Sequence, residues 1–220
     1  MHGRVAPLLL RTHGDRRRAA RDGVGPVSGP SVRCFIAVRL PDQVRASLAA
    51  VCAELRGQTR GLSWVREDNL HLTLRFLGEV EPVTLERVRE AVTAAAAGVA
   101  PFTVSLGGLG GFPPGRSPRV LWAGVAAGAE EIMALHAALE TALAARSVPK
   151  ESRAFHPHVT LARARDPRGA GGLRSALGTG PVFGEARVTA LHLMRSELDP
   201  RGARHSVLME ARLVHRSGVG

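Results

Sequence analysis

The 220-residue sequence contains little cysteine, and its two cysteines are Cys34 and Cys52. Two isolated cysteines form neither a disulfide framework nor a zinc site. Both fall among apolar residues, so we expect buried thiols in a reducing compartment. The sequence also lacks any apolar run close to the roughly 20 residues that a transmembrane helix requires. We therefore expect a cytoplasmic protein that does not enter a membrane, and we expect it to be a monomer.

Acidic residues are scarce relative to basic ones, with 19 Asp and Glu against 30 Lys and Arg and a formal net charge of +11. This excess predicts either an arginine-rich solvated surface or attraction to a polyanion such as RNA. Residues 1–31 are rich in Gly, Pro and Arg without helical or strand periodicity, which predicts a disordered basic extension. Residues 215–220 are expected to be a flexible tail.

A short phrase, His-x-Thr-Leu, occurs twice, as His71–Leu74 and as His158–Leu161. Both copies lie in runs with strand character, where residues two apart point to the same face. Each histidine should therefore share a face with its threonine, Thr73 or Thr160. The apolar residues of each phrase should face the core.

The sequence around the two phrases repeats as well. An apolar strand and an amphipathic helical pattern precede each phrase, at 34–38 and 44–55 in the first copy and 120–125 and 132–143 in the second. An internal duplication explains this arrangement. We expect one domain over 32–214, built from repeats of about 32–111 and 119–214. The two repeats should form lobes related by an approximate twofold axis, with both histidines facing one cleft.

Glycine and proline suggest where the remaining boundaries lie. Gly107–Pro118 is predicted to be a flexible connector between the lobes, and Gly178–Gly184 a further loop. Gly78 is expected to end the strand of the first phrase, and Pro82 to begin a helix. We also expect a helix-like stretch at 173–177. Closing strands are expected at 186–195 and 205–213.

A pair of histidines across a cleft suits phosphodiester cleavage, because a neutral imidazole can act as base while a protonated one acts as acid. Threonine hydroxyls on the same face can donate to phosphoryl oxygens as charge develops. A metal site using His156 and His158 has no carboxylate or cysteine at ligand spacing, and no nucleophile-elbow motif supports a serine hydrolase. We expect no metal and no cofactor, and we expect His156 to be a loop residue.

Beyond these arguments, the chain resembles the two-histidine phosphoesterase superfamily, and more narrowly the RNA 2′,3′-cyclic phosphodiesterases, also labelled 2′-5′ RNA ligases. The segments that carry the resemblance are Arg33–Ala37, Asn69–Gly78, Arg119–Gly124, Pro157–Arg163 and Arg195–Leu198. It extends from about Val32 to Leu213. It implies a bilobal α+β fold, with two mainly antiparallel sheets flanked by helices around a central cleft.

The resemblance also implies an activity, the metal-independent hydrolysis of an RNA-terminal 2′,3′-cyclic phosphate to a 2′-phosphomonoester. The implied roles are His71 as proton donor, His158 as proton acceptor, Thr73 and Thr160 as phosphate ligands, and Phe76 and Arg163 as contacts to the terminal nucleotide. The alternatives are a cyclic phosphodiesterase acting on a small nucleotide and an RNA-binding or 2′-5′ RNA-joining protein. One departure from the family pattern is His205, where a tyrosine-like aromatic residue is expected.

Overall fold

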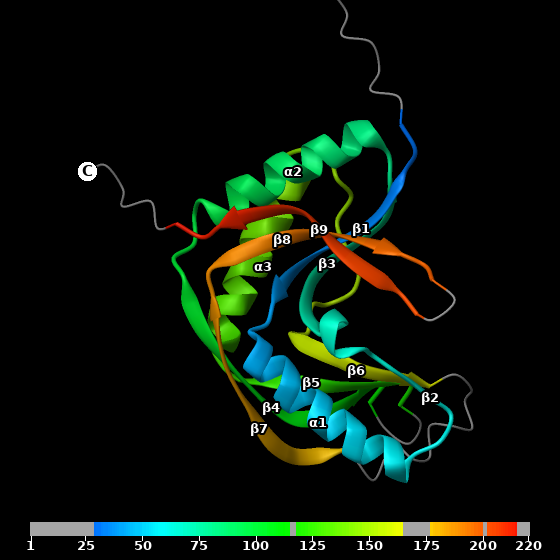
Figure 1. Cartoon of the computed structure of the whole chain (residues 1–220). Coiled ribbons are helices and arrows are strands. Elements are labelled where there is room, and N and C mark those ends of the chain that lie inside the picture. Colours follow the sequence, from blue (N-terminus) through cyan, green and yellow to red (C-terminus); the bar gives the residue numbers. More distant parts are fainter. Residues whose placement is uncertain (1–28, 115–117, 165–176, 200–201, 215–220) are drawn as a thin grey trace, which may run out of the picture.

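The computed structural model describes residues 29–114, 118–164, 177–199 and 202–214 (Figure 1). The expected disordered stretch up to residue 28, the expected helix over 173–176 and the tail at 215–220 lie outside the described residues. The elements in chain order are β1 (Val32–Arg39), α1 (Asp42–Gln58), β2 (Leu62–Trp64), the 3-10 turn η1 (Glu67–Asn69), β3 (His71–Val80), α2 (Pro82–Ala96), β4 (Phe102–Phe112), β5 (Val120–Ala127), α3 (Ala129–Ala144), β6 (His158–Ala164), β7 (Gly178–Val188), β8 (Ala190–Glu197) and β9 (Arg204–Arg212).

The strands form one curled sheet in the order β7-β4-β5-β6-β3-β1-β8-β9, with β2 also paired to β6. All the pairings between these strands are antiparallel. The expected α+β class with mainly antiparallel pairing is therefore confirmed, and the two expected sheets are joined into one. The two halves join where β3 meets β6 through the register pair Leu72 and Val159, and this narrow junction makes the sheet continuous.

The helices form where apolar residues recur every three or four positions. In α1 the buried stripe is Val44, Leu48 and Cys52, and in α3 it consists of Ile132, Leu135, Leu139 and Leu143. Pro82 stands at the start of α2, as predicted. Figure 1 shows α2 beside α3, and α1 packs against β7 in the other half of the sheet. None of the described helices has the length and apolar character needed to cross a membrane.

The predicted connector at Gly107–Pro118 is mostly strand, because β4 continues to Phe112 and pairs with both β5 and β7. Its glycines make room for a ring. Gly110 lies opposite Trp122, and a Cβ atom on Gly110 would overlap the Trp122 ring. The predicted loop at Gly178–Gly184 is likewise part of β7. In that strand Gly180 packs against Leu109. A Cβ atom added to Gly180 would lie only 3.0 Å from the Cγ atom of Leu109.

Two further boundaries differ from the prediction. The strand β3 passes through Gly78, which adopts a φ of 73°, and ends at Val80. The single closing strand expected over 186–195 is divided into β7 and β8. The division occurs because β7 pairs with β4 in one half of the sheet, whereas β8 pairs with β1 in the other. The strand β4 of the first repeat thus pairs with β5 and β7 of the second, and β8 of the second repeat pairs with β1 of the first.

Candidate active site

The junction between β3 and β6 brings the two His-x-Thr-Leu phrases together. The Leu72 and Val159 side chains, which pair across it, are both fully buried. In each strand, the residues before and after this buried residue project to the other face of the sheet. Antiparallel register then sets His71 beside Thr160 and Thr73 beside His158. Each histidine therefore shares a face with the threonine of its own strand.

A β-bulge follows each threonine and determines which later residues reach the same face. Opposite β3, Ala37 pairs with Thr73 and Ile36 with Arg75, so Leu74 is left without a partner. Opposite β6, Leu121 pairs with Ala162 and Trp122 with Thr160, which leaves Leu161 unpaired in the same way. An extra residue reverses the alternation of a strand.

The bulges bring Phe76 and Arg163 onto the face of the histidines. Each lies five residues after its histidine, an odd offset that would point it to the opposite face of a regular strand. The two strands share one pattern of exposure over seven residues, with Phe76 and Arg163 exposed at the sixth position. Arg75, at the fifth position, is buried instead.

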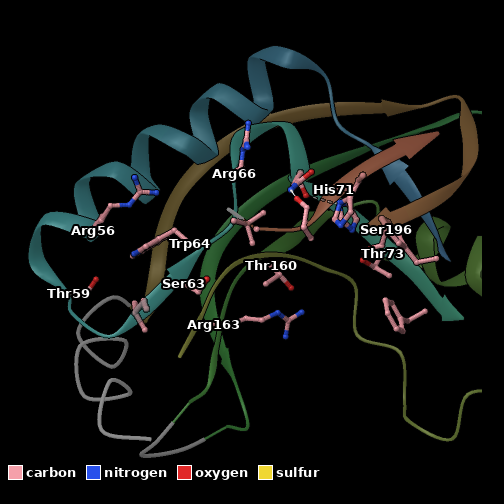
Figure 2. A pocket seen from close by; sticks show the side chains of 18 of the residues that line it. Arg56, Thr59, Ser63, Trp64, Arg66, His71, Thr73, Thr160, Arg163 and Ser196 are labelled. Carbon is pink, nitrogen blue, oxygen red and sulfur yellow. Dashed lines mark hydrogen bonds between the residues drawn. The ribbon is translucent and has the colours of Figure 1, made fainter. Parts of the chain in front are cut away.

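A cleft of about 630 Å³ lies over this face and contains most of the predicted site (Figure 2). His71, Thr73, Phe76, Thr160 and Arg163 line it. His158 is not among the lining residues, although its charge lowers the pKa of His71, so the two rings lie within electrostatic range of each other. The structure thus places five of the predicted residues in one cleft, and His158 outside the lining of that cleft.

Both histidines are held by the same kind of hydrogen bond. The Nδ1 atom of His71 lies 2.7 Å from the Asn69 carbonyl oxygen, and that of His158 lies 2.6 Å from the His156 carbonyl oxygen. A carbonyl oxygen only accepts, so each Nδ1 carries hydrogen and donates it. Each Nε2 is left to exchange protons with a substrate. His156 thus orients His158 through its backbone, in keeping with its prediction as a loop residue.

Aromatic rings enclose each histidine. The Phe35 ring stacks on His71 with a centroid distance of 4.7 Å, and the His205 ring meets His71 edge-on at 5.3 Å. On the other side, Phe112 meets His158 at 5.1 Å, and Trp122 lies at 6.2 Å from it. These rings replace water around both imidazoles, which disfavours the charged form.

The pKa values respond to this packing. The pKa of His71 is lowered to about 4, chiefly by burial and also by the neighbouring His205, whereas the hydrogen bond to Asn69 acts in the opposite direction. Burial also lowers the pKa of His158, again opposed by its hydrogen bond to His156. Both shifts favour the neutral imidazole in the free protein. A proton donor at His71 requires something that raises its pKa, and a bound phosphate anion does so.

The lining also includes Phe35, Trp64 and His205, to which the sequence assigned no role. The His205 ring contacts both Phe35 and His71. The departure from a tyrosine-like residue at His205 was the one signal that marked this position. No group of three or more His, Cys, Asp or Glu residues within the described parts of the chain could hold a metal ion.

A sequence model of the 2′-5′ RNA ligase superfamily matches residues 40–200. The chain belongs to this superfamily. The family expected from the two phrases is thereby confirmed. Among relatives, an RNA 2′,3′-cyclic phosphodiesterase of Methanothermobacter thermautotrophicus is 33% identical, over 78% of this chain and 93% of the relative. One from Thermus thermophilus is 36% identical, over 80% and 88% of the respective chains.

Solved structures of superfamily members share the fold. The TT0787 protein of Thermus thermophilus is 35% identical with a TM-score of 0.68, covering 82% of this chain and 97% of its own. Escherichia coli LigT complexed with 3′-AMP is 28% identical with a TM-score of 0.67, covering 84% and 99%. The likeness therefore spans nearly the whole length of these superfamily members.

Proposed function

We propose that this chain is an RNA 2′,3′-cyclic phosphodiesterase that hydrolyses the terminal cyclic phosphate to a 2′-phosphomonoester without a metal ion. The observation that carries the proposal is the pair of His-Thr units that meet where β3 joins β6, beside a cleft lined by His71, Thr73 and Thr160, each with its histidine Nδ1 bound to a backbone carbonyl. The names of the relatives support the enzyme class and an RNA substrate.

In the proposed reaction, Nε2 of His158 takes a proton from water as the water oxygen forms a bond to phosphorus. The bond from phosphorus to O3′ breaks, and Nε2 of His71 gives its proton to O3′. The products are a 2′-phosphomonoester and a free 3′-hydroxyl group. The Thr73 and Thr160 hydroxyls donate to the non-bridging oxygens, where charge builds up. Phe76 and Arg163 contact the terminal nucleotide.

The role of His71 depends on the substrate. In the free cleft its pKa is about 4, so only a small fraction carries a proton at pH 7. The negative charge of the cyclic phosphate raises the pKa of a histidine beside it. His71 thus gains its proton as the substrate binds. Arg163 opposes this effect, because its charge lowers the pKa of His71 until a phosphate anion offsets it.

The test is turnover of an oligoribonucleotide that ends in a 2′,3′-cyclic phosphate, with the product position determined chromatographically. We expect a 2′-phosphate, full activity in excess chelator, and loss of turnover in both His71→Ala and His158→Ala. His136→Gln serves as the control, because His136 lies on α3 and outside the cleft. Inhibition by chelator that added zinc or manganese reverses, or joining of RNA ends without hydrolysis, would contradict the proposal.

The acid and base roles can be separated with a substrate in which sulfur replaces O3′. A thiolate leaves without needing a proton, because its pKa is far below that of a ribose hydroxyl. His71→Ala should recover most of its activity on the sulfur substrate, whereas His158→Ala should stay inactive on both. Rescue of His158→Ala instead would reverse the two roles.

A further inference from the structure

The cleft extends well past the two histidines, toward the end of α1 and the short strand β2. Five polar or aromatic residues line this part, and we call them the distal arm: Arg56, Thr59, Ser63, Trp64 and Arg66. Figure 2 shows Arg56 and Trp64 at the opposite end of the cleft from His71. None of these residues takes part in the proposed reaction.

The sheet register determines how the arm follows on from the catalytic strands. Within β2, Ser63 pairs with Arg163 and Trp64 pairs with Ala162. Trp64 is therefore displaced from Thr160 by two residues along β6, roughly 7 Å at the rise of a β-strand, and by one strand across the sheet. The Arg56 guanidinium lies 5.8 Å from the centre of the Trp64 ring. Ser63 thus shares the face of Arg163, whereas Trp64, paired with the buried Ala162, packs partly against the core and also lines the cleft. The arm begins at the Arg163 end of the phosphate site and leads away from the histidines.

The charge of the cleft favours an anionic chain. Its described lining includes Arg56, Arg66 and Arg163 and neither aspartate nor glutamate. Arg56 and Arg163 form no ion pair within the described residues, and Arg66 has only an exposed one to Asp68 at 3.7 Å. Exposed pairs of this kind are weak and exchange easily for another anion. Three guanidinium groups are therefore available to phosphates.

We propose that the distal arm binds the nucleotide that precedes the cyclic-phosphate-bearing end of the RNA. Trp64 stacks on the base of that nucleotide, and Arg56 and Arg66 contact its backbone phosphate. Aromatic rings combined with arginines are the usual means of binding single-stranded RNA with little regard to sequence. This inference rests on the proposed function, and it specifies the substrate as an RNA chain of at least two nucleotides.

The test compares a 2′,3′-cyclic mononucleotide with a dinucleotide and a hexanucleotide that share the same 3′ end. We expect the wild-type kcat/KM to be on the order of tenfold higher for the dinucleotide than for the mononucleotide, the effect of one stacked base. Trp64→Leu and Arg56→Ala should remove most of this advantage and leave the mononucleotide rate unchanged. Arg60→Ala is the matched control, since Arg60 is an exposed arginine of the loop between α1 and β2 and does not line the cleft.

Two outcomes would overturn the inference. Equal wild-type kcat/KM values for mononucleotide and dinucleotide would show that the arm binds no second nucleotide. An equal loss on both substrates in Trp64→Leu, with normal thermal unfolding, would mean that Trp64 contacts the terminal nucleoside itself. Trp64→Phe should restore most of the dinucleotide advantage, because the smaller ring still stacks.

A binding measurement separates this inference from the proposed function. Fluorescence anisotropy with a labelled dinucleotide ending in a 2′-phosphate reports on the arm without any turnover. Tighter binding by wild type than by Trp64→Leu would support the arm even if no cyclic phosphate were hydrolysed, in which case only the proposed function would fail. Equal binding by the two proteins would contradict the arm, whatever the activity.

Discussion

Leu72 and Val159 face each other where β3 meets β6, and both side chains are fully buried. This single pair is the centre of an approximate twofold relation between the two His-Thr units. On each side of it a histidine donates from Nδ1 to the carbonyl two residues earlier, and a bulge follows the threonine. The geometry of the proposed reaction therefore depends on one apolar contact in the core.

The pKa of His71 gives a direct test of how the cleft is charged. In a proton NMR titration of the free protein, we expect the His71 imidazole to titrate near pH 4, well below an ordinary histidine. Saturation with a nucleoside 2′-phosphate should raise this pKa, because an anion stabilises the imidazolium. An unchanged pKa on binding would remove the basis for His71 as proton donor.

The same shift affects stability. Below the ordinary histidine pKa of about 6.5 the unfolded chain takes up a proton that folded His71 does not, so folding free energy is lost as the pH falls from 6.5 toward 4. Above pH 6.5 this histidine contributes no pH dependence. The midpoint of urea unfolding should decrease between pH 7 and pH 5, and His71→Asn should reduce that decrease. An identical decrease in the variant would mean that His71 does not have a depressed pKa.

The two threonine hydroxyls should matter for chemistry and not for folding. Thr73→Val and Thr160→Val keep the branched shape that suits a strand, but they remove the donor to the phosphoryl group. We expect turnover to fall on the order of 10²-fold in each variant, as for single oxyanion-hole donors. Thr141→Val is the control, because Thr141 bonds only within α3. If both Thr→Val variants keep wild-type turnover, the threonine hydroxyls have no part in catalysis.

Arg163→Lys provides the contrasting substitution at the same cleft. It keeps a positive charge but loses the planar guanidinium that can bind phosphate at two points or stack on a base. We expect KM to rise more than kcat falls, the reverse of the pattern for the threonines. Steady-state kinetics on the dinucleotide substrate measures both constants. A selective loss of kcat would indicate that Arg163 acts in the chemical step.

Arg75, which the bulge directs into the core, connects the two copies. Its guanidinium pairs with Glu140 of α3 at 3.3 Å and donates to the Pro149 carbonyl, at the start of the loop that leads to His158. Arg75→Met should destabilise the protein by roughly 3 to 5 kcal/mol, because it leaves Glu140 unpaired in a largely buried position. Urea unfolding measures this effect. Arg87→Met on the exposed face of α2 should change stability by less than about 0.5 kcal/mol.

Combining Arg75→Met with Glu140→Gln should restore part of the lost free energy of unfolding, because the unpaired charge is then removed. If the double variant is no more stable than Arg75→Met, the ion pair is not the source of the loss.

The glycines of β4 should be required by packing and not by flexibility. Gly110→Ala places a Cβ atom within the space of the Trp122 ring, so we expect a loss of about 1 to 3 kcal/mol from overpacking. Gly57→Ala is the matched comparison, because Gly57 lies in α1 with nothing within 4 Å of an added Cβ. It should stabilise the helix by roughly 0.5 to 1 kcal/mol. A neutral result at Gly110 would mean that the Trp122 ring can move aside at little cost.

The sequence by itself determined the features that depend on neighbouring residues. Alternation predicted that His71 shares a face with Thr73 and His158 with Thr160, and the apolar spacing located α1 and α3. The duplication of the phrase predicted that the two copies lie together, and they meet at the pair Leu72 and Val159, although His158 is not among the residues that line the cleft. These inferences succeeded because periodicity and short-range sterics act over a few residues, within the reach of the local sequence.

The tertiary structure decided what depends on contacts between distant segments. The glycines of β4 predicted a loop, whereas they make room for Trp122 against Gly110, and the two bulges bring Phe76 and Arg163 onto the face of the histidines. Whether a strand bulges, or which half of the sheet it joins, is set by its hydrogen-bonded partners and by the side chains that fill the space across it. Those partners lie far away in the sequence, and the local pattern does not encode them.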